Sequence, residues 1–319
     1  MRSDAPAPEA PHPDVYVGRD GWLFLTGGSN RVLAQYGVPG FSRAALWRWR
    51  RLLEDRVRRC NRLGIRFAHV VAPEKLSVQL DALDGLEFDP DRAPALRLAR
   101  WLRLSIAQGA WIDLVGPFRA RARASALYRR TDSHWTFAGG LLAYQAICRH
   151  LGVAPREDFE ARRTGSDDLM NTGDLGLKLD PPRAEVAESC VFASEARRVH
   201  ANRLLLELEA KGRGYDAHIG AQAVFRNAAA PDPRRLVLFG DSYAHHTPNP
   251  RTGTLTPLLA DTFAEVHMLW STSVDWAYLE RVRPDFVVTE IAERFMIDLP
   301  QRNFSIERLA ELAMARKGV

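Results

Sequence analysis

The chain has 319 residues, of which 46% are hydrophobic and 26% charged, so it holds too much apolar material for a disordered protein. Lys and Arg number 44 against 39 Asp and Glu, which gives a net charge of +5, and the cations are spread along the whole chain. This distribution argues against a nucleic-acid-binding arm. No stretch approaches the run of about 18 apolar residues that crosses a membrane, so no transmembrane segment is predicted.

The first residues, MRSDAPAPEAPHPD (1–14), are rich in Pro and Ala and lack the charged-then-apolar pattern of a secretory leader. We expect residues 1–14 to form a disordered tail. As it stands, the sequence predicts a cytoplasmic protein, whereas prior removal of a signal peptide would make the protein periplasmic.

After residue 14 the hydrophobic pattern alternates between strand and helix spacing. A hairpin is predicted at 15–25, then a helix at 42–63 with Ser42 as its N-cap, and a buried strand at 65–72. The alternation continues along the chain, with further helices expected at 91–107, 136–150, 255–264, 274–282 and 305–316, and further strands at 111–115, 236–240, 265–270 and 285–291.

This alternation predicts an α/β protein with three layers, in which helices cover both faces of a mostly parallel, doubly wound sheet. Residues 153–232 are the exception because they are polar and irregular. We interpret residues 15–319 as a single domain in which 153–232 form an insertion over the carboxyl edge of the sheet, where such folds bind their ligands.

One local pattern, LVLFGDSYAHH (236–246), places a serine directly after a buried strand. At the carboxyl end of such a strand the Ser242 hydroxyl would be exposed, and nearby backbone N–H groups could face a developing oxyanion. Taken alone, the pattern is equally compatible with Asp241 or Ser242 acting only as the cap of the next helix.

A second pattern, YRRTDSHWTFAGG (128–140), places Asp132 and His134 two residues apart before a helix. Serine is a weak nucleophile unless an imidazole removes its proton, and the imidazole needs a carboxylate to fix its tautomer. An Asp-x-His pair supplies both groups in one loop. The alternative is that Asp132 or Ser133 merely caps the helix.

Together these residues carry a family resemblance. GDS after a hydrophobic strand resembles the nucleophile block of the SGNH (GDSL-type) hydrolases, but here it follows the acid–base block, whose spacing is D-x-H. That order is similar to the circularly permuted SGNH-like domain of the alginate O-acetyltransferase group. Further segments resembling that group are VGRDGWLF (17–24), VVAPEK (70–75), TGDLGLKL (172–179) and FVVTEIAERF (286–295).

The resemblance implies that Ser242 is the nucleophile, His134 the general base and then acid, and Asp132 the carboxylate that orients it. An acyl-serine would form and a hydroxyl acceptor would then take the acyl group. For the oxyanion hole we consider the backbone N–H of Ser242 or Tyr243. Asn171 and Gly173 are weaker candidates, since their segment could fold over the site.

Substrate-binding candidates follow from position. Arg294 either contacts substrate or pairs with Glu290 across one helical turn. Trp270 and Trp276 flank a strand-to-helix loop expected at the same edge of the sheet, where aromatic faces either bind sugar rings or pack in the core. Arg130 either recognises an anionic group or is a solvated surface charge.

His245 and His246 follow the nucleophile block, and His245 is a candidate for lining the acceptor pocket. Adjacent histidines without a matching carboxylate spacing do not predict a metal, so we expect no metal site.

The function indicated is therefore a serine-dependent O-acetyltransferase acting on a carbohydrate or on a glycosylated or hydroxylated metabolite. An esterase or deacetylase would use the same three residues with water as acceptor, and a non-catalytic carbohydrate-binding or assembly module is a third hypothesis. No permanently bound cofactor is expected. The donor would be acetyl-CoA or another acetyl ester, or, in an exported protein, an acyl-donating membrane partner.

Overall fold

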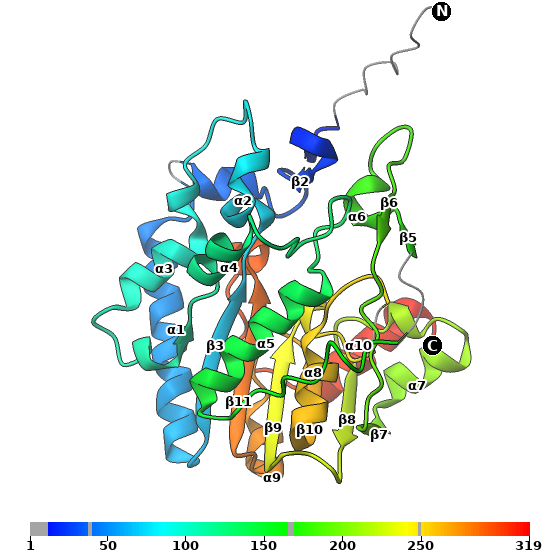
Figure 1. The fold of residues 1–319 in the computed structure, drawn as a ribbon. Helices are drawn as coiled ribbons and strands as arrows, with labels where there is room; N and C mark the ends of the chain where they lie inside the picture. The colour runs from blue at the N-terminus through cyan, green and yellow to red at the C-terminus, as the bar shows by residue number, and fades with distance from the viewer. Residues whose placement is uncertain (1–11, 38–39, 165–168, 248–249) are drawn as a thin grey trace, which may run out of the picture.

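The structure is a computed structural model that describes residues 12–37, 40–164, 169–247 and 250–319. Within this part of the chain a seven-stranded sheet runs through the molecule, with its four central pairs parallel and two antiparallel pairs at one edge (Figure 1). Its strands in spatial order are β4 (Trp111–Ile112), β3 (Arg66–Ala72), β11 (Phe286–Ala292), β9 (Asp232–Gly240), β10 (Phe263–Trp270), β8 (Gln222–Arg226) and β7 (Arg197–Ala201).

Helices cover both faces of this sheet, because alternate side chains of each buried strand point to opposite sides. In β9, for example, Leu238 packs in one core cluster and Val237 in the other. Leu238 shares its cluster with α5 (Phe137–Leu151) and α8 (Leu255–Thr262). Val237 shares its cluster with α1 (Arg43–Arg62), α3 (Pro94–Leu102) and α9 (Trp276–Val282). The predicted three-layer αβα fold is confirmed.

Most predicted elements occur within a few residues of their expected bounds. The hairpin consists of β1 (Val15–Val17) and β2 (Leu23–Leu25), and the last helix is α10 (Ile306–Lys317). Ser42 caps α1 as expected, since its hydroxyl accepts from the Ala45 N–H at 3.1 Å. The short helices α2 (Lys75–Val78) and α4 (Val115–Arg121) are additions to the prediction.

Two predicted elements are longer than the observed ones. The helix expected at 91–107 is α3 alone, because Pro94 opens it and the chain turns after Leu102, where the Ser105 hydroxyl accepts from the Ala107 N–H. The strand expected at 111–115 stops at Ile112, since the Asp113 carboxylate accepts from the Val115 N–H and so begins α4.

The segment 153–232 divides into two parts, so the expectation that all of it lies over the carboxyl edge is wrong. Its second part extends the sheet through β7 and β8, joined by α7 (Arg203–Ala210). β7 carries Arg197 and Arg198 on the exposed edge, which discourages further strand pairing. Only the first part, with β5 (Leu169–Asn171), α6 (Gly173–Gly176) and β6 (Glu185–Ala187), lies over the carboxyl end of the sheet (Figure 1).

A buried carboxylate ties this segment to the core. Asp261 in α8 has no exposed surface, and it accepts from the Arg162 guanidinium at 2.6 Å and the Ser194 hydroxyl at 2.6 Å.

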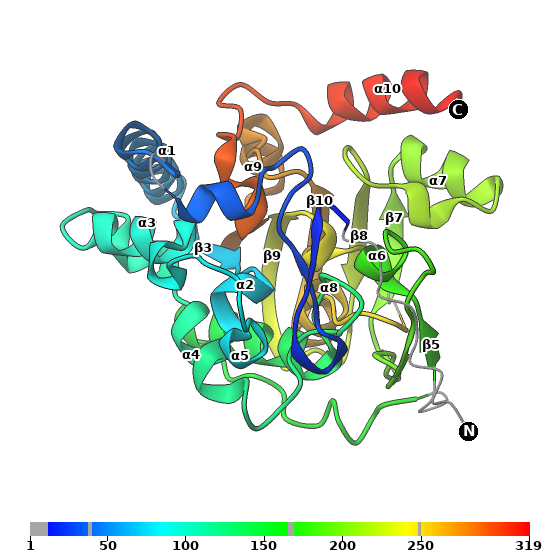
Figure 2. The same cartoon turned by 90° about the horizontal axis from the view of Figure 1, so that it is seen from above.

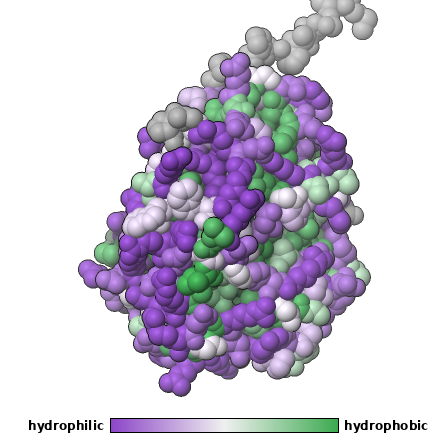
Figure 3. Space-filling view, turned by 90° about the vertical axis from the view of Figure 1, so that its left-hand side faces the viewer, coloured by the Kyte–Doolittle hydropathy of each residue, from purple (hydrophilic) through white to green (hydrophobic). Residues whose placement is uncertain are grey.

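Of the residues expected to form the disordered tail, 1–11 lie outside the described part of the chain. No helix among the described residues combines the length and apolar character that crossing a bilayer requires. The face formed on the side of α1 and α3 is dominated by hydrophilic side chains, with small separate apolar patches (Figure 3).

Candidate active site

Ser242 occupies the turn that follows β9, in a short 3-10 helix, Ser242–Ala244. The preceding Asp241 fixes this turn, because its carboxylate accepts from the Tyr243 N–H at 3.2 Å and from the Ala292 N–H at 2.7 Å. The Asp241 N–H in turn donates to Glu290 Oε2 at 2.9 Å. Asp241 therefore acts as the cap, and Ser242 keeps its hydroxyl for other partners.

Asp132, His134 and Ser242 form a continuous hydrogen-bonded relay. His134 Nδ1 lies 2.6 Å from Asp132 Oδ1, and His134 Nε2 lies 2.8 Å from Ser242 Oγ. Since an ionised carboxylate can only accept, Nδ1 carries the hydrogen and Nε2 is left to accept from the serine hydroxyl. Thr136 caps α5, because its hydroxyl accepts from the Gly139 N–H at 3.3 Å. Neither Asp132 nor Ser133 therefore acts as the cap of this helix.

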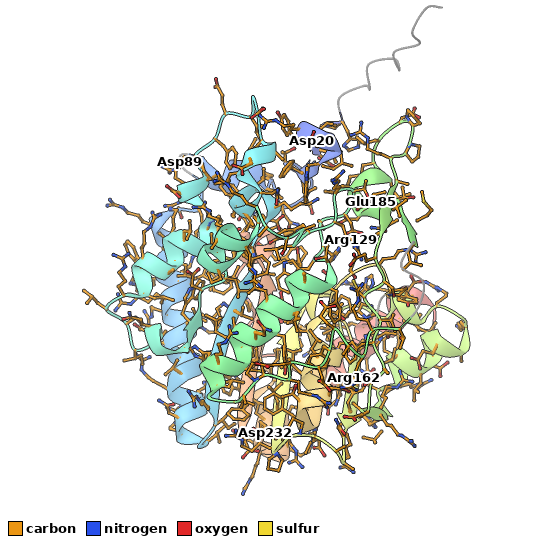
Figure 4. All side chains as sticks on the ribbon, viewed as in Figure 1. Asp20, Asp89, Arg129, Arg162, Glu185 and Asp232 are labelled. Atoms are coloured by element: carbon orange, nitrogen blue, oxygen red, sulfur yellow. The ribbon has the colours of Figure 1, made fainter. Side chains whose placement is uncertain are left out.

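Hydrogen bonds to two separate parts of the fold hold the loop that carries Asp132 and His134. Below it, the buried Lys75 ammonium donates to the carbonyls of Arg129 at 2.7 Å and Arg130 at 3.1 Å. Above it, Glu185 in β6 accepts from the Thr131 N–H at 3.0 Å. Figure 4 shows Arg129 and Glu185 at the same end of the sheet, opposite Asp232, the first residue of β9.

Ser133, between the two relay residues, is clamped by two charged side chains. Asp174 in α6 accepts from the Ser133 N–H at 2.7 Å and from its hydroxyl at 2.6 Å. The buried Arg294 donates to the same hydroxyl at 3.0 Å. Sequence reasoning missed Asp174, although it lies in the TGDLGLKL block that carried the family resemblance.

Burial and charge act in opposite directions on the relay. Burial alone would lower the pKa of His134, but the adjacent Asp132 carboxylate outweighs it and raises that pKa above the ordinary value. Burial would likewise raise the pKa of Asp132, but His134 holds it well below its usual range. Beneath the nucleophile turn, burial raises the pKa of Glu290 well above the ordinary value, and the nearby Asp241 charge raises it further.

Ser242 opens on a cavity of about 780 Å³, within the usual range for small-molecule sites. Gly240, Ser242 and Trp270, at the carboxyl ends of β9 and β10, line its inner end. Further walls come from the loop 295–305, helix α10, the loop 271–273 that follows β10, and His218 and Ile219 before β8. Trp270 lies in the lining of the same cavity as Ser242, so it stays a candidate for substrate binding.

Hydrogen bonding separates the oxyanion candidates. The Tyr243 N–H already donates to Asp241 at 3.2 Å. The Asn171 carbonyl accepts from the Thr131 hydroxyl, but within the described part of the chain its buried side-chain amide nitrogen has no hydrogen-bond partner, so Asn171 stays a candidate donor. Gly173 packs against the Asp132 loop. The backbone N–H of Ser242 is a further candidate.

Four substrate-binding candidates lie elsewhere than expected. Arg294 is buried and pairs with Glu74 at 2.5 Å, so it neither bonds to Glu290 nor lines the cavity. Trp276 packs on the other face of the sheet, beneath the Arg59 guanidinium.

His245 and Arg130 are likewise absent from the cavity beside Ser242. His245 is buried, with its ring against Trp270 and His246. Arg130 lines a separate hollow that also includes Glu185 and Arg183.

Three side chains of metal-ligating type meet at the relay, since atoms of Asp132, His134 and Asp174 lie within 4.8 Å of one another. Each of these atoms already has a protein partner, because Asp132 bonds to His134 and Asp174 bonds to Ser133. The contacts therefore explain the cluster without a metal.

Replacement of Gly173 by alanine should displace the relay. Its φ is +66°, and a Cβ there would lie 2.3 Å from the Thr131 carbonyl oxygen and 2.7 Å from Asp132 Cβ. We expect Gly173→Ala to lose roughly 1–3 kcal/mol of stability to this overlap, and about 10- to 100-fold in ester hydrolysis because a misplacement of about 1 Å can cost that much.

Gly212→Ala is the matched control. Gly212 has the same φ of +66° but no atom within 4 Å of an added Cβ, so the two variants share the left-handed backbone strain and differ only in the contact. Thermal unfolding and hydrolysis of an activated ester measure both effects. Equal behaviour of the two variants would refute this role for Gly173.

Comparison with known proteins identifies the family of the chain. The family described as SGNH hydrolase-like domain, acetyltransferase AlgX, matches residues 15–249. The curated proteins contain no match to the chain.

Solved structures share the fold at low sequence identity. Bacillus cereus PatB1 is 15% identical with a TM-score of 0.57, over 95% of this chain and all 100% of that one. The O-acetyltransferase domain of Pseudomonas putida AlgJ is 16% identical with a TM-score of 0.50, over 95% and 100%. Pseudomonas aeruginosa AlgX is 16% identical with a TM-score of 0.53, over 93% and 66%. With most of its length matched by the family, the chain belongs to the SGNH hydrolase-like acetyltransferase domains of the AlgX type.

Proposed function

We propose that the protein is a serine-dependent O-acetyltransferase that moves an acetyl group through Ser242 onto a hydroxyl of a carbohydrate or of a glycosylated or hydroxylated metabolite. The observation that supports this most directly is the relay from Asp132 through His134 to Ser242, which opens on a cavity of about 780 Å³. A relay of this kind is what a serine needs in order to act as a nucleophile at neutral pH.

In the first half-reaction, Ser242 Oγ attacks the carbonyl carbon of an acetyl ester while His134 Nε2 takes the hydroxyl proton. Asp132 stabilises the resulting imidazolium through Nδ1, and the Ser242 N–H faces the oxyanion. Collapse of the tetrahedral intermediate breaks the bond to the leaving group. His134 returns the proton to that group, and acetyl-Ser242 remains.

The second half-reaction reverses these roles with a new alcohol. His134 removes the proton of the acceptor hydroxyl, whose oxygen attacks the acetyl carbon and releases Ser242. Water in the acceptor position would make the same site an esterase, so the competition between bound acceptor and water decides the outcome. The donor is an acetyl ester or thioester such as acetyl-CoA, supplied as a co-substrate or handed over by a partner protein.

Intact mass measurement tests the proposal. The protein is incubated separately with 4-nitrophenyl acetate and with acetyl-CoA, and peptide mapping then locates any added acetyl group. We expect one acetyl group, on the peptide that contains Ser242, and its discharge as an acetylated product when a sugar acceptor is added. Discharge that yields only acetate at saturating acceptor would favour the esterase, and acetylation at other residues alone would refute the proposal.

A further inference from the structure

Hydrogen bonds hold the walls of the cavity beside Ser242 in place. The Gln301 N–H donates to the Ser273 hydroxyl at 2.8 Å, and the Ile306 N–H donates to the buried Asp275 carboxylate at 2.9 Å. These two bonds hold the loop 298–305 and the start of α10 against the loop that follows β10. α10 also rests on Gly220, where an added Cβ would lie 3.1 Å from Ala310 Cα. Figure 2 shows α10 along the outer side of the fold, on the same side as α9 and next to α7.

The lining of this cavity is largely apolar and remains partly exposed. Leu312 is 51% exposed and Phe295 is 37% exposed, so the cavity presents apolar surface that a bound ligand would cover. The apolar lining residues are Ile219 before β8, Trp270 at the strand ends, Phe295, Leu299, Pro300 and Phe304 on the loop wall, and Leu309 and Leu312 on α10. The end at Ser242 therefore offers a ligand a hydroxyl group, whereas the wall at α10 offers it apolar side chains.

The lining has no excess of positive charge. His218 lines the cavity too, and burial lowers its pKa, which favours its neutral form. Asp298 and Arg308 contribute one charge of each sign, and the remaining charged lining residue, Asp241, is buried and bonded to backbone N–H groups. A site for an anionic sugar would need an excess of cations, which this lining does not provide. Among the described residues, the Gln301 and Asn303 side-chain amides have no hydrogen bond to the protein, so both are available to the hydroxyl groups of a neutral ligand.

From these observations, and on the basis of the proposed acetyl transfer, we propose that the cavity binds the acetyl acceptor and that this acceptor is an uncharged glycoside with an apolar aglycone. The sugar lies at the Ser242 end, with its hydroxyls within reach of His134 and the two amides. The aglycone lies against α10, where Leu309 and Leu312 exclude water from it.

Binding to the unreacted protein tests this assignment without any chemical step. Isothermal titration calorimetry compares phenyl β-D-glucoside with methyl β-D-glucoside, which lacks the apolar aglycone, and with phenyl β-D-glucuronide, which adds a negative charge. We expect the phenyl glucoside to have a Kd at least about tenfold lower than either of the others. Equal or tighter binding of the methyl glucoside or of the glucuronide would overturn the proposal.

A matched pair of variants locates the aglycone. Leu312→Ser removes an exposed leucine from the cavity, and Leu206→Ser removes an equally exposed one, 50% against 51%, from α7 outside it. We expect only Leu312→Ser to reduce the preference for phenyl over methyl glucoside, by at least about threefold. An unchanged preference in Leu312→Ser, or an equal loss in both variants, would contradict the placement.

The proposed acetyl transfer and the proposed ligand class can be refuted independently of each other. Acetylation of Ser242 by an activated ester decides whether the serine chemistry occurs, whereas the Kd ratios decide which ligand class the cavity accepts. A protein that binds phenyl glucoside selectively but is never acetylated would refute the transfer reaction and retain the ligand class.

Discussion

Ser242→Ala is expected to abolish acetyl-enzyme formation and to lower both acetyl transfer and ester hydrolysis by about 10⁴-fold or more. The reason is that Ser242 Oγ is the atom 2.8 Å from His134 Nε2, and alanine leaves the imidazole with no hydroxyl to deprotonate. The fold should be retained, since Asp241 fixes the turn through its carboxylate and its backbone N–H. Steady-state hydrolysis of 4-nitrophenyl acetate and intact mass give the two readouts.

Ser125→Ala serves as the control for this variant, because Ser125 lies on the loop before the relay and does not line the cavity. It should match the unmodified protein in both assays. Retention of acetylation at near-normal rates by Ser242→Ala would show that another residue carries the acetyl group and would end the proposed mechanism.

Asp132→Asn should lower kcat/KM by roughly 10³- to 10⁴-fold, because an amide no longer holds the productive tautomer of His134 or stabilises its charged form. Asp132 Oδ1 accepts both from the His134 backbone N–H at 2.9 Å and from its Nδ1 at 2.6 Å. Asp174→Asn is the comparison, since Asp174 bonds to Ser133 instead of to the imidazole. We expect Asp174→Asn to lose much less activity.

The pH profile separates this effect from simple misfolding. His134 must be neutral to act as a base, so activity falls as the pH decreases through its pKa, which the Asp132 charge holds above the ordinary value. Without that charge, burial dominates and lowers the pKa of His134. The acid limb of kcat/KM should therefore move to lower pH in Asp132→Asn. An unmoved acid limb would show that His134 is not the titrating base.

The sequence predicted the parts of the fold that depend on local pattern. β9 and β11 are apolar runs of strand length, and α1 has a clear cap at Ser42, so their positions follow from short-range physics. β8 was overlooked because its pairing with β10 is antiparallel and at an edge, and only tertiary contact selects it. The family assignment made from ordered motifs is confirmed.

Within the candidate site, the three relay residues could be found from their residue types and motif order, whereas their surroundings could not. Arg294 lies four residues after Glu290, a spacing that indicates an ion pair, yet the chain bends after β11 and brings Arg294 to Glu74. Trp276 begins α9, and its side chain turns to the opposite face of the sheet. Such directions depend on backbone turns that no local pattern encodes.

The carboxyl group of Glu290 gives the fold and the chemistry opposite responses to acid. Its raised pKa means that the folded chain retains a proton that the unfolded chain releases, so for this group the free energy of unfolding decreases as the pH rises above the carboxyl's ordinary range. Mild acidification therefore strengthens the support under the nucleophile while it protonates His134 and stops turnover. At low pH the protein would therefore be inactive, while the contribution of Glu290 to the free energy of unfolding would be at its largest. Neutralisation would restore the activity.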